Sequence, residues 1–381
     1  MPFTGVSAMD FKLEFVRLAS AEGANRRELC RRFGISPSLG YRLLSRYAVQ
    51  GDAGLLERSR RPHGSPRTTS DEIEAAVMAV RAAHPVWGGR KIAAVLRRQG
   101  LAAPSPSTVT QILRRQGATL GAFGGGHAPF IRFEHAAPND LWQMDFKGHV
   151  AFGSGAGRLH PLTVLDDHSR FCVVLEACAD QERATVKSSL IKAFRRYGQP
   201  WRITADNGPP WGSGWAGDGV GRPWTALGVW LLEHDVALSH SRPYHPQTQG
   251  KDERFHRTLK AEALSGPPFA DLDEAVRHLQ SWRTIYNTQR PHEARALETP
   301  ITRYAPSPRA YSDHVAPFAY GPDDLLRRVD DGRISFKAHR IRVPKAFSGK
   351  IVALRPSQID GQFDLVFRAR TITTIDLARP M

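Results

Sequence analysis

Apolar residues recur at helical spacing through the first fifty positions of the chain. They form three successive groups: Phe11, Phe15 and Leu18, then Leu29, Phe33 and Ile35, then Leu39, Leu43, Leu44 and Tyr47. Gly34 interrupts the second group, and Ser36 followed by Pro37 is typical of a helix cap and a first helical position. The pattern therefore predicts helices joined by a tight glycine turn.

A second unit repeats this design. Helical patterns cover Asp71–Ala83 and Arg90–Gln99, and Ser105 with Pro106 begins a third helix over Thr108–Gln116. When the two segments are aligned with Ser36 opposite Ser105, the apolar and arginine positions of the last helix in each unit coincide. A single copy could be an ordinary helical hairpin, but two copies with arginines on their last helices favour tandem helix-turn-helix units that bind DNA. The candidate DNA contacts are Arg42, Arg46, Arg114 and Arg115, with Arg58, Arg60 and Arg61 in the basic linker between the copies.

The pattern changes to strands that alternate with helices after about residue 136. Leu141–Phe146, Leu159–Leu165 and Phe171–Ala177 are apolar runs that predict three consecutive strands. Helix, strand, helix, strand and helix patterns follow up to Leu264, which predicts an α/β core with a mixed five-stranded sheet and flanking helices. After one more helix, short alternating runs from Leu325 to Leu377 predict a small β-barrel.

These patterns divide the chain into several domains. We expect a first helix-turn-helix domain in residues 1–56, a basic linker in 57–69, a second helix-turn-helix domain in 70–117, a linker in 118–135, the α/β core in 136–304 and the β-barrel in 305–381.

The charge distribution points to a polyanionic partner. The chain of 381 residues has 53 Lys and Arg against 37 Asp and Glu, a net charge of +16. Residues 1–130 hold 19 basic and 9 acidic residues, residues 131–300 hold 20 of each, and residues 301–381 hold 14 and 8. The excess lies at both ends, so double-stranded DNA is the expected partner.

Other classes of protein are disfavoured by the same sequence. Its three cysteines contain no C-x-x-C pair, which supports neither a disulfide framework nor a cysteine zinc site. No apolar stretch approaches about 18 residues, so no membrane association is expected. We expect a cytoplasmic, nucleoid-associated protein.

Three carboxylates occur in motifs where chemistry is expected. Asp145 lies in W-Q-M-D-F-K-G, Asp206 in T-A-D-N-G, and Glu253 in H-P-Q-T-Q-G-K-D-E-R-F-H. Each alone could be a turn or capping acid. Jointly, and in this order, the motifs resemble those of the retroviral-integrase and insertion-sequence transposase superfamily, most closely the bacterial insertion-sequence transposases of the three and four-eighty-one groups. L-T-V-L-D-D-H-S-R (Leu162–Arg170) and Y-N-x-x-R-P-H (Tyr286–His292) also resemble segments of these proteins.

The resemblance covers about Ala136 to Tyr304 and implies a ribonuclease-H-like fold for the core. It assigns the catalytic and metal-binding positions to Asp145, Asp206 and Glu253. By the same resemblance, Asp166 and Asp167 match non-catalytic acids of the family, and Asp252 is a solvated neighbour of Glu253. Arg257 and Lys260 share the helix face of Glu253, and family members hold the DNA backbone with basic residues at these offsets.

The sequence departs from the family pattern in two places. Between Asp206 and Glu253 lie 46 residues (253 − 206 − 1), which indicates an insertion at Pro209–Trp224. The zinc-binding N-terminal domain of retroviral integrases is absent, and the tandem helix-turn-helix units stand in its place, which favours a transposase.

The donor set itself argues for metal. Three carboxylates that converge repel one another unless a cation neutralises them. Hard oxygen ligands select Mg²⁺ or Mn²⁺, and two ions per active site can hold the attacking and leaving oxygens of a phosphoryl transfer.

The sequence therefore predicts a DNA transposase. It would bind the ends of its insertion sequence, cleave DNA and join the 3′-hydroxyl ends to target DNA, as a dimer or tetramer by resemblance. A non-catalytic helix-turn-helix DNA-binding regulator is the main alternative. A ribonuclease H that acts on hybrid duplexes would explain the acids but not the helix-turn-helix units.

Overall fold

The computed structural model describes residues 7–57, 69–119, 134–155, 157–206, 208–212, 224–240 and 250–377. The chain divides into two compact units, residues 1–68 and 69–381. The predicted linkers 57–69 and 118–135 and the predicted insertion at 209–224 fall largely outside the described residues.

The first unit is a small helical domain. It consists of α1 (Ala8–Ala19), α2 (Arg26–Arg32), α3 (Pro37–Gln50) and a 3₁₀ helix, Gly51–Leu55. Ser36 caps α3 by accepting a hydrogen bond from the Leu39 N–H at 3.3 Å. Gly34 has a φ of 63°, a conformation that favours glycine, and it makes the tight turn between α2 and α3. The predicted helix, turn and helix are confirmed, over a core that includes Phe15, Cys30 and Leu43.

The second helical domain opens the second unit. It consists of α4 (Asp71–Ala83), α5 (Gly89–Arg98) and α6 (Pro106–Arg115), packed around Trp87, Ile92 and Ile112. Ser105 caps α6 as Ser36 caps α3, by accepting from the Thr108 N–H at 3.2 Å. The predicted repeat of the same local design is therefore present in the structure.

A mixed sheet forms the centre of the second unit. Its strands are β1 (Trp142–Phe146), β2 (Val150–Ala151), β3 (Arg158–Asp166), β4 (Cys172–Cys178), β5 (Arg202–Ala205) and β6 (Ala237–His240). The order is β2-β3-β1-β5-β6, with β4 also paired to β3. The β1, β3 and β4 ladders are antiparallel, whereas β5 runs parallel to both β1 and β6. The five predicted strands are present, and the two-residue β2 is an addition.

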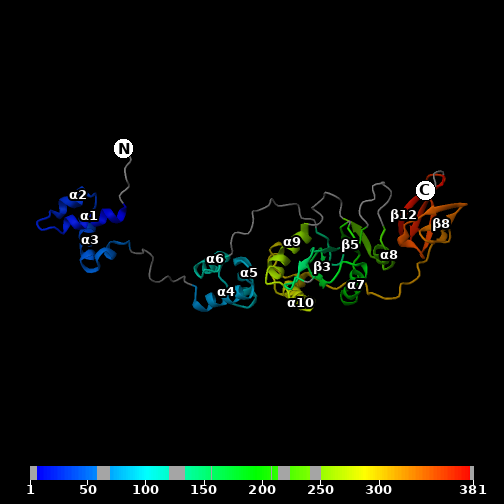
Figure 1. Ribbon diagram of the computed structural model, residues 1–381, viewed down its shortest axis with the longest axis horizontal. Coiled ribbons are helices and arrows are strands. Elements are labelled where there is room, and N and C mark those ends of the chain that lie inside the picture. The colour runs from blue at the N-terminus through cyan, green and yellow to red at the C-terminus, as the bar shows by residue number, and fades with distance from the viewer. Residues whose placement is uncertain are drawn as a thin grey trace. The chain divides into compact units, whose positions relative to one another are not determined.

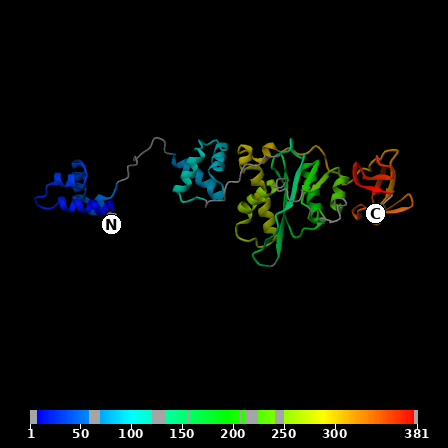
Figure 2. The ribbon, with the colours of Figure 1, turned by 90° about the horizontal axis from the view of Figure 1, so that it is seen from above.

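Helices cover both faces of this sheet (Figures 1 and 2). On one face lie α7 (Arg183–Tyr197) and α8 (Ala226–Glu233), which share a core with Trp142, Leu162 and Ile203. The other face carries α9 (Gly250–Leu259), a π-helix (Lys260–Leu264) and α10 (Leu272–Thr288). This order of antiparallel and parallel strands between two helical layers is the ribonuclease-H-like arrangement that was expected for the core.

The C-terminal part forms two sheets. β7 (Leu325–Arg328), β10 (Ile351–Pro356), β11 (Gln362–Phe367) and β12 (Arg370–Asp376) make a four-stranded antiparallel sheet, and β8 (Arg333–Phe336) with β9 (His339–Arg342) makes a hairpin. Short 3₁₀ helices occupy Glu293–Arg295, Pro300–Arg303 and Lys345–Phe347. The predicted closed barrel is wrong, because the sheets share an apolar core but no ladder joins them around a cylinder in the described residues.

Helix α8 is buried on two sides. Leu227, Trp230 and Leu231 belong to the core under the central sheet. Val229 and Leu232 instead pack into the C-terminal core, near Phe347 and Val352. A helix that is apolar all round is stable only when it is covered all round, so the C-terminal sheets complete the burial of α8.

The Y-N-x-x-R-P-H segment has a structural role at the end of α10. Asn287 accepts a hydrogen bond from the Cys172 N–H at 2.8 Å and donates to the Cys172 carbonyl at 3.0 Å, which fixes α10 to β4. Arg290 lies 2.9 Å from the buried Glu262, and Lys91 of α5 lies 3.6 Å from the same carboxylate. Burial lowers the pKa of Lys91 to about 8. The π-helix, α10 and the second helical domain therefore meet at one buried ion cluster.

Candidate active site

Asp145 and Asp206 lie next to each other at the carboxyl ends of two parallel strands. Asp145 belongs to β1 and Asp206 directly follows β5. The register pairs Trp142 with Ile203 and Gln143 with Thr204, so two further steps bring the two aspartates opposite each other. Burial, together with the neighbouring charge of Asp206, raises the pKa of Asp145 to about 6. Two carboxylates are thus held together at the edge of the sheet.

The carboxylate of Asp206 is oriented by donors from the loop that follows it. The Gly208 N–H donates to Oδ1 at 2.9 Å, and the indole N–H of Trp211 donates to the same oxygen. The Trp211 ring stacks on Phe146, the last residue of β1, at 5.3 Å between centroids. The His240 ring donates through Nδ1 to the Asp206 backbone carbonyl at 2.7 Å. Asp206 is therefore fixed from both β1 and β6.

His256 lies beside Asp145, a contact that the sequence pattern does not predict. The Thr163 hydroxyl donates to the Asp145 backbone carbonyl at 2.9 Å and accepts from His256 Nε2 at 2.9 Å. This leaves Nδ1 facing the Asp145 carboxylate, 3.8 Å from Oδ2. Burial lowers the pKa of His256 to about 4, so the imidazole is neutral at pH 7. The signal in the sequence is weak: His256 follows Asp252 by four residues on one helix face.

Helix α9 carries exposed and buried charged residues on different faces. Glu253 and Arg257 are exposed, as is Lys260 at the start of the π-helix, whereas Asp252 and His256 are buried. The prediction that Asp252 is solvated is wrong. Its carboxyl group packs toward the sheet, and burial together with the charges of Asp145 and Asp167 raises its pKa well above the ordinary value. The reason is the helical turn of about 100° per residue, which sends adjacent side chains to different faces.

The start of α9 is anchored to the sheet by Asp167. Its carboxylate pairs with Lys251 and accepts from Gln143 Nε2 at 2.8 Å and from the His135 N–H at 3.0 Å. The neighbouring Asp166 accepts from the Ser169 and Asn139 N–H groups at 2.8 and 2.7 Å. The bonds to Asp166 hold the turn between β3 and β4, and those to Asp167 connect α9 with β1. The non-catalytic role of both acids stays a prediction.

The described residues contain no group of three or more His, Cys, Asp or Glu that is placed to hold a metal ion. Segment 241–249, which leads into Glu253 and contains most of the predicted glutamate loop, lies outside the described residues. Asp145 and Asp206 still offer oxygen donors suited to a hard divalent cation, and their mutual repulsion is the kind that such a cation relieves. The role of Glu253 stays a prediction.

The predicted DNA contacts differ in their surroundings. Arg42 of α3 and Arg114 of α6 are exposed. Arg46 donates to the Leu56 carbonyl at 2.6 Å, and Arg115 pairs with Glu74 of α4, so both are engaged within their own domains. Arg58, Arg60 and Arg61 lie outside the described residues.

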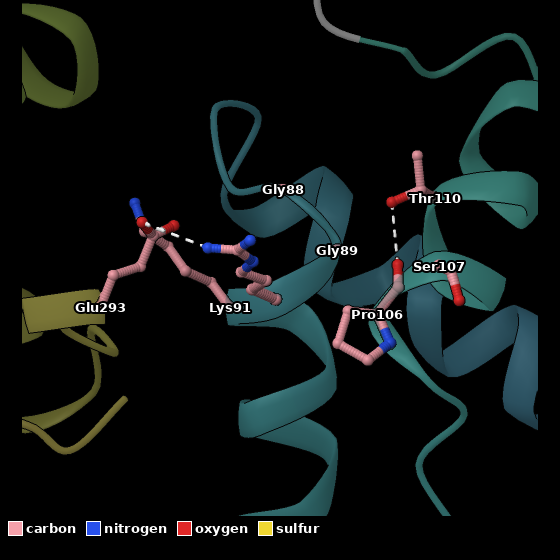
Figure 3. A pocket seen from close by; sticks show the side chains of 8 residues that line it. Gly88, Gly89, Lys91, Pro106, Ser107, Thr110 and Glu293 are labelled. Carbon is pink, nitrogen blue, oxygen red and sulfur yellow. Dashed lines mark hydrogen bonds and ion pairs between the residues drawn. The ribbon is translucent and has the colours of Figure 1, made fainter. Parts of the chain in front are cut away.

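A cavity of about 370 Å³ lies where the N-termini of α5 and α6 approach each other (Figure 3). Gly88, Gly89, Pro106 and Ser107 supply its backbone walls, and the Thr110 hydroxyl donates to the Pro106 carbonyl at 2.8 Å. Glu293 approaches from the segment after α10, 4.0 Å from Arg90. This cavity is separate from the aspartate pair.

The raised pKa of Asp145 predicts a pH-dependent stability in the absence of metal. Between about pH 4 and pH 6, the folded state binds this proton more tightly than the unfolded chain does, so the free energy of unfolding falls as pH rises. Asp145→Asn should remove this loss and stabilise the protein by on the order of 2 kcal/mol at pH 8, with little effect at pH 3.5. Thermal melts of both proteins in EDTA measure the difference, and parallel curves across the range would contradict it.

The helical domains, the central core and the C-terminal part each match models of known protein families. Residues 135–246 and 234–300 match models of an integrase core domain, and residues 324–380 match the C-terminal domain of IS481 family transposases. Residues 11–63 match a helix-turn-helix domain and residues 40–113 a homeodomain-like domain. None of the described helices has the length and apolar character needed to cross a membrane.

Individual relatives include insertion-element proteins. An uncharacterized 31.7 kDa protein of insertion element IS407 from Burkholderia multivorans is 27% identical over 61% of this chain and 80% of its own length. A putative transposase for insertion sequence element IS5376 from Geobacillus stearothermophilus is 23% identical over 65% of this chain and 61% of its own length. Among solved structures, the HTLV-2 integrase catalytic core domain in complex with magnesium is 17% identical, with a TM-score of 0.33, over 44% of this chain and 97% of that one.

Proposed function

Because the chain belongs to the insertion-sequence transposases of the retroviral-integrase superfamily, we propose that it cuts DNA at the ends of its element and joins the free 3′-hydroxyl groups to target DNA. The observation that carries this proposal is the pair of aspartates at the carboxyl ends of β1 and β5. Helix-turn-helix domains in the same chain supply the recognition of DNA.

Asp145, Asp206 and Glu253 are the residues that would hold Mg²⁺ or Mn²⁺. Bound there, two divalent ions would activate water or a 3′-hydroxyl and stabilise the oxygen that leaves phosphorus. Trp211 and Gly208 orient the Asp206 carboxylate, and Thr163 ties the backbone of Asp145 to His256.

The exposed residues of α9 and of the π-helix that continues it support the placement of DNA beside these acids. Arg257 and Lys260 are exposed on the same side as Glu253, at four and seven residues beyond it. Their charges would bind the phosphates of the DNA end while Glu253 faces the reacting bond. In this proposal the protein acts as a dimer or tetramer that brings two element ends together, and it works on the bacterial nucleoid.

The test is cleavage of a labelled duplex that carries the terminal repeat of the element. We expect the purified chain to release a 3′-hydroxyl end with Mg²⁺ or Mn²⁺ but not with EDTA, and to join that end to a supercoiled plasmid. Specific binding without cleavage in either metal would contradict the proposal and favour a DNA-binding regulator. Cleavage confined to the RNA strand of a hybrid duplex would favour a ribonuclease H.

A further inference from the structure

Trp211 is a buried aromatic residue in the loop that follows β5. Its side chain is 2% exposed and belongs to the core under the central sheet. The ring stacks on Phe146 of β1 with an interplanar angle of 18°. The Thr225 hydroxyl donates to the Trp211 backbone carbonyl at 3.1 Å, and the Gly212 N–H closes the loop on the Gly208 carbonyl at 2.7 Å. Both the ring and the backbone of Trp211 are therefore held in place.

The indole N–H points at one oxygen of the Asp206 carboxylate. It donates to Oδ1, and the Gly208 N–H donates to the same oxygen at 2.9 Å. In the part of the chain that the structure describes, both hydrogen bonds to this carboxylate end on Oδ1. An ionised carboxylate has about four lone-pair sites, shared equally by its oxygens, so the two donors occupy Oδ1 fully. A cation that binds Asp206 is left with Oδ2.

The number of free oxygens matters because divalent cations differ in how they use a carboxylate. Ca²⁺ takes about six to eight oxygen ligands and binds carboxylates through one or both oxygens. Mg²⁺ instead requires near-ideal octahedral geometry at about 2.0–2.1 Å. A carboxylate with one free oxygen therefore suits Mg²⁺, whereas the same group with both oxygens free also suits Ca²⁺.

We propose that Trp211 is a positioning residue that makes the candidate site selective for Mg²⁺ over Ca²⁺, because it restricts Asp206 to coordination through one oxygen. The ring N–H is the part that matters, since phenylalanine would stack on Phe146 in the same way but donate nothing. A buried indole N–H usually has an acceptor, and here that acceptor is the carboxylate. This role of Trp211 rests on the proposed function, in which Asp206 holds the metal ion.

The test measures ion binding by the full chain in the absence of DNA. Thermal melts are titrated with MgCl₂ and with CaCl₂ at constant ionic strength, since an ion that binds the folded state raises the melting temperature according to its dissociation constant. Trp211→Phe should raise the dissociation constant for Mg²⁺ about tenfold, a usual effect of losing a group that orients a metal ligand. The constant for Ca²⁺ should rise less than about twofold or fall, because Oδ1 becomes free to coordinate.

Trp230→Phe is the matched control. Trp230 lies in the same core as Trp211 and stacks on Phe194 of α7, so the variant makes the same change away from the carboxylate. It should leave the ratio of the two dissociation constants at the wild-type value. Asp206→Asn removes the candidate ligand and gives the background of ion binding elsewhere on the protein.

A rise in the ratio of the Mg²⁺ to the Ca²⁺ constant in Trp211→Phe alone supports the role of Trp211. An unchanged ratio, or an equal rise in Trp230→Phe, overturns it. If Trp211→Phe does not fold in EDTA, Phe146→Leu decides instead: it removes the ring on which the indole stacks and should shift the ratio in the same direction, and no shift overturns the proposal.

Failure of the proposed function would give a different result. Wild-type ion binding that Asp206→Asn does not weaken would contradict the metal site itself, and with it the role of Trp211. Mg²⁺-dependent cleavage of the element end, measured on the same proteins, reports separately on the proposed function.

Discussion

Glu253→Gln, Asp145→Asn and Asp206→Asn are each expected to abolish cleavage and joining while they leave binding to the element end near that of the wild type. The amide keeps the size of each side chain but removes the charge that a divalent cation needs. Loss of one ligand from such a site should slow the reaction by several orders of magnitude. Mg²⁺-dependent release of a labelled end, with binding measured in parallel by gel shift, checks both halves of this expectation.

Asp252→Asn is the matched control, since it makes the same chemical change one residue away. Asp252 is 5% exposed and packs toward Asp145 and Asp167, whereas Glu253 is exposed. Asparagine fits the same buried space, so this variant should fold and keep most of its activity. If Asp252→Asn were inactive while Glu253→Gln stayed active, the third metal-binding carboxylate would be Asp252 and not Glu253. Full activity in all four variants would refute the metal-carboxylate mechanism.

Removal of residues 1–68 should lower affinity for the element end by at least about a hundredfold and leave the remainder folded. These residues form a compact unit of their own, with a separate core around Phe15 and Leu43. Specific DNA complexes are commonly about 4–10 kcal/mol tighter than non-specific ones, and loss of one of two recognition units removes a large part of that difference. Anisotropy titrations with the element end and with a random duplex measure the two affinities.

The affinity for the random duplex should fall much less, because the cationic C-terminal part is retained. A matched single change is Arg42→Ala in the full chain, at an exposed position of α3. It should weaken binding to the element end more than binding to the random duplex. Equal weakening on both would assign Arg42 to phosphate contact, and unchanged end binding after removal of 1–68 would exclude this unit from recognition.

Local signals explain why so much of the architecture could be predicted. Ser36 and Ser105 cap α3 and α6 with their own hydroxyl groups, and Gly34 makes the turn that precedes the first cap. These interactions span only a few residues, so the sequence pattern contains them directly. The apolar runs at β1, β3 and β4 are similarly unambiguous because the strands are buried by helices on both faces.

The features that were missed depend on contacts between distant segments. His256 reaches Thr163 across 93 residues, and burial of Asp252 depends on which face of α9 meets the sheet. Nothing within α9 alone decides that face, since both sides carry charged residues. The closure of a barrel is also a long-range property: alternating runs predict strands, but they do not determine whether the edge strands pair with one another.

Because α8 is buried on two sides, the C-terminal sheets keep its second apolar side out of water and so help to keep the protein soluble. A stop codon just before Leu325 would remove the residues that cover Val229 and Leu232 and leave an apolar helix face in water. Such a truncated product should self-associate even though every candidate catalytic residue is retained. Inactivity of a shortened copy would therefore say nothing about DNA contacts, and point substitutions on an intact chain are the informative way to probe this region.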